Sequence, residues 1–112
     1  MEDDDAAASL ATTLLEDDER VRVVGRAENG EEALALAASL VPDAIVMDLQ
    51  MPVMDGVEAT RRLREGGSQA TIVIVTGSDP GKIEAARAAG ADDVVMKPPR
   101  GEELVAAVLS RT

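Results

Sequence analysis

The sequence predicts an α/β protein whose parallel sheet is covered by helices on both faces. Four short runs, rich in Val and Ile, are too short for helices and alternate with longer stretches whose apolar residues recur at helical spacing. The last three runs are nearly continuous in apolar residues, which is typical of strands buried on both faces. This alternation, with short connections, predicts a doubly wound sheet with right-handed crossovers. The predicted strands are residues 21–24, 44–47, 71–75 and 93–96.

Turn residues at the ends of the intervening stretches support the helices. Asp55 and Gly56 form a turn and N-cap before the third helix. Pro80 suits the first turn of the fourth helix, and Gly90 fits the C′ position at its end. The predicted helices are residues 5–16, 31–40, 57–65, 80–89 and 102–110.

Composition narrows the functional classes. A chain of 112 residues fits one domain, so we expect no output domain beside it. Eleven basic against 22 acidic residues give a net charge of −11, which disfavours nucleic acid and anionic membrane surfaces as partners. The chain has no Cys and no His, so a bound metal should be a hard cation held by oxygen. No apolar run reaches the roughly 20 residues of a membrane span, and the amino terminus is acidic, so we expect a cytoplasmic protein.

Polar residues occur where the predicted strands end. Asp48, Thr76 and Lys97 each follow an apolar run, and the acidic pair Glu2 and Asp3 would follow a strand if one preceded it. The carboxyl ends of parallel strands meet at one edge of a sheet, where ligands bind. Carboxylates gathered there repel by roughly 3 kcal/mol per pair at ~5 Å and an effective dielectric of about 20. Nearby positive charges would offset this repulsion, and Lys97 and a divalent ion such as Mg²⁺ could provide them.

A carboxylate beside Mg²⁺, a lysine and a hydroxyl can accept a phosphoryl group as an acyl phosphate. In this interpretation Asp48 is the nucleophile, Thr76 donates a hydrogen bond to a phosphoryl oxygen, and Lys97 neutralises charge. Each residue also has a plainer interpretation on its own. The acidic terminus suits a solvated tail, Asp48 suits a turn before Met51, and the other two suit an ordinary surface. The coincidence of all of them at strand ends favours the functional interpretation.

Three segments resemble the response-regulator receiver domains of two-component signalling. AIVMDLQMPVMDG (44–56) resembles their phosphoacceptor segment, and VIVTG (73–77) and GADDVVMKP (90–98) resemble the two segments that follow it, in the same order and spacing. The resemblance covers nearly the whole chain and implies a flavodoxin-like doubly wound parallel sheet. It also implies that Asp48 is phosphorylated by a sensor histidine kinase or phosphotransfer protein.

The resemblance further implies a ligand set and a backbone feature. Mg²⁺ would be bound by Glu2 through water, by Asp3, by Asp48 and by the backbone carbonyl of Gln50. The Lys97–Pro98 peptide bond would be cis, a form that only X-Pro bonds adopt at modest cost.

The chain departs from the receiver pattern at its amino terminus. Receivers have a first strand of some five apolar residues before the acidic pair, whereas only Met1 precedes Glu2 here. Without this strand the fold would lose of order 10 kcal/mol of stabilisation from buried apolar side chains. We therefore expect a weakened fold and a loosely held metal ion. Three accounts are open: a natural chain that begins further upstream, which we favour, direct pairing of the second and third strands, or a strand donated by another chain.

The chain also departs from receivers at their signalling residue. Receivers commonly signal through an aromatic residue three positions before the lysine, and that position is Val94. Phosphorylation would then be transmitted through Thr76 and residues 77–82 alone, or by dimerisation, or only weakly. A downstream partner would bind the face formed by the fourth helix and the last strand. The leading hypothesis is a phosphoacceptor that is not an enzyme beyond its own phosphorylation and dephosphorylation. One alternative is a phosphate-independent receiver-like interaction module. Another is a phosphatase or phosphotransferase with an aspartate nucleophile, but such an enzyme would need a second acid two residues after Asp48, where this chain has Gln50.

Overall fold

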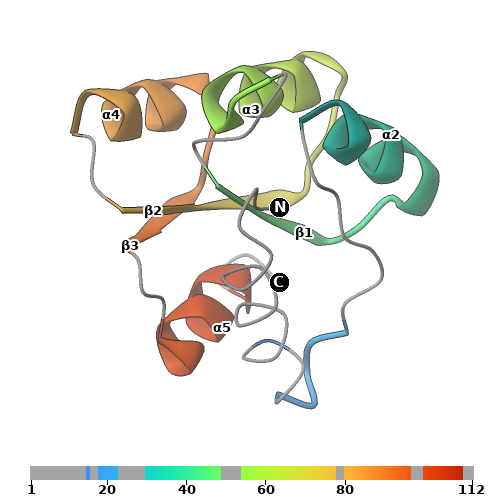
Figure 1. Cartoon of the computed structure of the whole chain (residues 1–112). Coiled ribbons are helices and arrows are strands. Elements are labelled where there is room, and N and C mark those ends of the chain that lie inside the picture. Colours follow the sequence, from blue (N-terminus) through green and yellow to red (C-terminus); the bar gives the residue numbers. More distant parts are fainter. Residues whose placement is uncertain are drawn as a thin grey trace.

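The protein is built on a parallel sheet. The structure, a computed structural model, describes residues 15, 18–22, 30–48, 54–77, 80–96 and 100–109. Three strands lie within these residues in the order β1-β2-β3 (Figure 1). Their bounds are β1 Ala44–Asp48, β2 Thr71–Thr76 and β3 Asp93–Met96. Both strand pairs are parallel, which confirms three of the four predicted strands and the predicted sheet type.

Helices cover both faces of this sheet. In Figure 1, α2, α3 and α4 lie in a row on one face, and α5 lies on the other. This two-sided cover confirms the doubly wound α/β class, and the helices begin within one residue of their predicted starts. None of the helices in the described part of the chain is long and apolar enough to cross a membrane. The bounds are α2 Gly30–Leu40, α3 Gly56–Glu65, α4 Pro80–Ala89 and α5 Gly101–Leu109.

The predictions for the amino-terminal quarter are tested only in part. Val21 and Arg22 lie in irregular backbone, so the strand predicted over 21–24 is wrong for its first half, and its second half lies outside the described residues. Leu15 is helical, as predicted, and packs against the α5 side of the sheet. The remainder of the helix predicted over 5–16, and the expected deficit of a first strand, lie outside the described residues.

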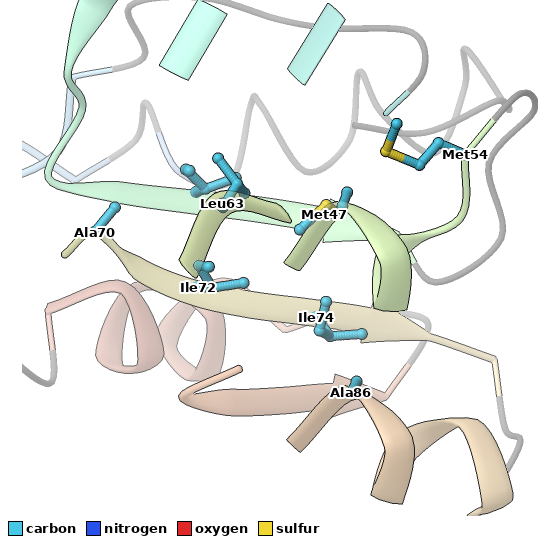
Figure 2. Close-up of a cluster of buried hydrophobic side chains, with 9 residues drawn as sticks. Met47, Met54, Leu63, Ala70, Ile72, Ile74 and Ala86 are labelled. Atoms are coloured by element: carbon cyan, nitrogen blue, oxygen red, sulfur yellow. The ribbon is translucent and has the colours of Figure 1, made fainter. Parts of the chain in front are cut away.

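The sheet separates two apolar clusters. All six residues of β2 are buried, and their alternation sends Ile72 and Ile74 to the α3/α4 face and Val73 and Val75 to the α5 face. Figure 2 shows the first cluster, with Met47 and Leu63 close above Ile72 and Ile74. Because both faces are packed with apolar side chains, β2 is the central layer of the described core.

The methionines divide between core and surface. Met47 is fully buried and Met54 is 8% exposed, as expected of residues that fill gaps in a core without aromatic rings. Met96, at the end of β3, is 45% exposed.

Arg64 at the end of α3 joins three segments at the amino ends of β2 and β3. Its guanidinium donates to the carbonyl oxygens of Ser68, Ala70 and Gly90 at 2.8–3.0 Å, and to the Asp92 carboxylate at 2.7 Å. The same carboxylate oxygen accepts the Ile72 backbone N–H at 2.8 Å. Both charged side chains are only about one-fifth exposed, so these hydrogen bonds are poorly replaced by water.

Gly90 completes this junction. It ends α4 with φ +120°, a conformation that L side chains rarely adopt. A Cβ there would lie 2.6 Å from Arg64 Cγ, so glycine is required both for the turn and for the close approach of the arginine. The predicted C′ glycine is thereby confirmed.

Replacing Arg64 should destabilise the fold far more than replacing a surface arginine of the same helix. Arg64→Met removes the arginine's hydrogen bonds to three carbonyls and its ion pair with a partly buried carboxylate, and we expect a loss of about 2–4 kcal/mol in the free energy of unfolding. Arg62→Met removes only an exposed pair with Glu58 at 2.9 Å, which should cost about 1 kcal/mol or less. Urea unfolding of both variants measures the difference, and equal losses would contradict the role given to Arg64.

Candidate functional site

The last residues of β1 and β2 form the described part of the candidate site. Asp48 ends β1 and Thr76 ends β2. Asp48 pairs with Val75 in the parallel register, and Thr76 pairs with Met96. Thr76 is therefore one residue beyond the partner of Asp48 on the neighbouring strand. The structure thus brings the predicted nucleophile and the predicted hydroxyl to the same edge of the sheet.

Both side chains are withdrawn from solvent. Asp48 and Thr76 are each 4% exposed, and both follow apolar strand residues. Burying a carboxyl group costs free energy unless other groups bind it. A buried aspartate at a strand end is therefore more typical of a functional site than of a surface turn. This burial excludes the plainer interpretation of Asp48 as a residue of an exposed turn.

The other predicted site residues lie outside the described residues. These are Glu2, Asp3, Gln50 and Lys97, and their roles stay predictions. In the sequence, Lys97 directly follows Met96, the register partner of Thr76. Within the described part of the chain, no group of three or more acidic side chains could hold a metal. The one described member of the predicted Mg²⁺ set, Asp48, offers the oxygen donors that this ion prefers.

The start of α3 fixes the far end of the segment that follows Asp48. Asp55 is the N-cap of α3, and its Oδ1 accepts the backbone N–H of Glu58 at 2.9 Å, as the sequence predicted. The preceding Met54 is buried against α2. A Cβ on Gly30, the first residue of α2, would lie 2.7 Å from both the Cβ and the carbonyl oxygen of Met54. Glycine at position 30 therefore lets α2 approach the segment between β1 and α3.

An ion pair that sequence reasoning missed lies beside this cap. Lys82 Nζ in the first turn of α4 is 3.9 Å from Asp55 Oδ2. The two residues are 27 positions apart, so no local spacing could have revealed the contact. The only available signal was topological, since helices that follow neighbouring parallel strands begin at the same edge of the sheet.

Surface charge pairs shift the pKa values of groups away from the strand ends. Hydrogen bonds from Arg61, and then from Arg62, lower the pKa of Glu58 on α3. Hydrogen bonds from the side chain and backbone of Arg20 lower the pKa of Asp18 to about 2. Both carboxylates are therefore ionised at neutral pH, and they belong to exposed helix and loop surfaces instead of the candidate site.

A parallel sheet with a buried aspartate and threonine on neighbouring strand ends defines a class of α/β domains whose site is built from side chains at the carboxyl edge. Comparison with known families makes the class specific. Residues 1–109 match the family model of the response regulator receiver domain. The chain belongs to this family, which places it in two-component signalling.

Individual relatives agree with the family. The response regulator MprA of Mycolicibacterium vanbaalenii is 46% identical over 90 residues, covering 77% of this chain and 39% of the relative. A protein-glutamate methylesterase/protein-glutamine glutaminase of Halalkalibacterium halodurans is 39% identical over 99 residues, covering 85% of this chain and 29% of the relative. The chain thus spans less than half the length of these curated relatives.

Solved structures show the same fold. The signal receiver domain of NarL from Mycobacterium tuberculosis superposes with a TM-score of 0.92 at 28% identity, covering 97% of this chain and 89% of the other. A DNA-binding response regulator of the LuxR family from Staphylococcus aureus gives 0.89 at 27% identity, covering 96% and 90%. These likenesses confirm the predicted receiver fold.

The close approach of Gly30 to Met54 can be tested by stability. Gly30→Ala places a methyl group against a backbone carbonyl that cannot move freely, so we expect a loss of about 1–3 kcal/mol in the free energy of unfolding. Gly77→Ala is the matched control, because a Cβ there meets nothing within 4 Å. Thermal or urea unfolding measures both. A Gly30→Ala variant as stable as the control would show that α2 yields without cost.

Proposed function

We propose that Asp48 accepts a phosphoryl group and that the chain signals through the resulting change around Thr76. The observation that carries this proposal is the placement of a buried aspartate and a buried threonine on neighbouring strand ends of a receiver domain. A carboxyl group and a hydroxyl at one edge of the sheet support this proposal, because an acyl phosphate needs a nucleophile for its formation and a donor for its recognition.

The bond changes are those of a phosphoryl transfer. A carboxylate oxygen of Asp48 forms a bond to phosphorus while the bond from phosphorus to the donor breaks, and the electron pair leaves with the donor. The donor is a phosphohistidine of a sensor kinase or phosphotransfer protein, or the acyl phosphate of acetyl phosphate. Thr76 donates its hydroxyl hydrogen to a phosphoryl oxygen, and Lys97 balances the negative charge.

Mg²⁺ fits the donor chemistry proposed for this edge. Glu2, Asp3, Asp48 and the carbonyl of Gln50 would hold it, all through hard oxygen atoms. When bound, it would neutralise charge on the phosphoryl oxygens. Asp48 alone then remains responsible for the covalent step.

Thr76 is placed to pass the change to α4. In the alternation of β2 it follows Ile72 and Ile74, which pack on the face covered by α3 and α4. Four residues later α4 begins at Pro80. A displacement of Thr76 toward a phosphoryl group would therefore move the start of α4 relative to the sheet. We propose that a downstream partner reads the face formed by α4 and β3, directly or in a homodimer.

A second function is favoured by one observation. Val94 is partly buried and packs against the α3/α4 cluster, and a valine is stiff about χ1. It cannot swing between exposed and buried positions as a large ring could. This supports, as the alternative, a phosphate-independent interaction module in the cytoplasm that keeps the receiver shape. Under either proposal the chain has no turnover of a separate substrate.

Intact-mass measurement after incubation with acetyl phosphate and Mg²⁺ tests the leading proposal. We expect an added phosphoryl group on the wild-type chain and none on Asp48→Asn, since the amide cannot act as the nucleophile. Incubation with EDTA in place of Mg²⁺ should strongly reduce the modification. A wild-type chain that gains no mass would overturn the proposal, and a modified Asp48→Asn variant would move the acceptor elsewhere.

A further inference from the structure

The Lys82–Asp55 ion pair joins the starts of two neighbouring helices. Asp55 uses Oδ1 to cap α3, and its Oδ2 is 3.9 Å from Lys82 Nζ on α4. The Asp55 carboxylate therefore contacts both helices. Figure 1 shows α3 and α4 side by side on the same face of the sheet. The cap fixes where the Asp55 carboxylate lies, because the hydrogen bond to the Glu58 N–H holds it against the first turn of α3.

The position of this pair along the chain relates it to the candidate site. Asp55 lies seven residues after Asp48, and Lys82 lies six residues after Thr76. Each member thus stands just beyond the segment that leaves one of the two functional strand ends. A link between the two helix starts restricts how far the ends of β1 and β2 can move apart.

We propose that Lys82 is a positioning residue for phosphoryl transfer at Asp48. By holding the start of α4 against the cap of α3, it keeps the hydroxyl of Thr76 near the position that a phosphoryl group on Asp48 would occupy. This inference rests on the proposed function of Asp48. The pair is exposed, with side chains 45% and 40% accessible, so its effect is modest and decreases with salt.

Two variants separate positioning from a simple effect of charge. Lys82→Gln removes a positive charge and Asp55→Asn removes a negative one, yet both break the same ion pair. Asn is as good an N-cap as Asp, so α3 keeps its cap. If Lys82 acted only by attracting an anionic phosphodonor, the first variant would slow phosphorylation and the second would speed it. Positioning predicts that both variants slow it.

The experiment measures the initial rate of phosphorylation by acetyl phosphate with Mg²⁺ at low ionic strength, over a range of donor concentrations. We expect both variants to reduce the limiting rate by about 1.4- to 5-fold, the range of an exposed ion pair. The double variant should be no slower than the slower single variant, and Lys82→Arg should restore the rate. Arg22→Gln, which removes an exposed positive charge outside α3 and α4, should leave the rate unchanged. High salt should bring the wild-type rate to that of the variants.

Hydrogen exchange provides a readout without any phosphodonor. If the ion pair restrains the end of β2, the amides of Thr76 and Gly77 should exchange faster in Lys82→Gln and in Asp55→Asn by a similar factor, and not in Arg22→Gln. Opposite rate changes in the two variants, or unchanged rates and exchange in a chain that is phosphorylated, would overturn the inference alone. A wild-type chain that takes no phosphoryl group would overturn the proposed function, and the positioning role with it.

Discussion

The partly buried pair of Arg64 and Asp92 is the interaction on which the placement of the strands depends. Arg64 reaches from the end of α3 to the segment before β2 and to the segment before β3. Asp92 in turn accepts the Ile72 N–H, and its own N–H donates to the Ile72 carbonyl oxygen at 2.8 Å. The entry of β3 into the sheet is thus fixed against the second residue of β2. Because a parallel register is constant along a strand pair, the same contacts determine which residues meet at the far edge.

The two edges of the sheet are held by different means. At the amino edge, an arginine and an aspartate, each about one-fifth exposed, are joined by charge-assisted hydrogen bonds that water replaces poorly. At the carboxyl edge, the contact between helix starts is a longer and more exposed ion pair. The stronger contact thus lies at the edge that sets the register, and the weaker one lies at the edge that carries Asp48 and Thr76. The proposed function would use this combination, because it requires a shift at the carboxyl edge within an unchanged fold.

Sequence patterns predicted the elements of this fold because those elements depend on local properties. The near-continuous apolar run 71–75 indicated a strand covered on both faces, and every residue of β2 is buried. Asp48 and Thr76 could be singled out as candidates for the same reason, since a polar residue that ends an apolar run is a local signal. Arg64 and Asp92 were missed because 28 positions separate them, and in isolation each is an ordinary surface residue of a helix end or a turn.

The absence of aromatic residues sets how a signal can leave the site. The core is filled by Val, Ile, Leu, Ala and Met, and at position 94 a partly buried valine packs against the α3/α4 cluster. A branched side chain with one preferred χ1 contributes packing but no second rotameric state. Under the proposed function, a movement at Thr76 would then reach α4 without a rotamer change at position 94, and the start of α4 would be the element with two positions. The contact of Lys82 with the α3 cap lies at that element, so even the modest strength of an exposed ion pair would act where the proposed movement begins.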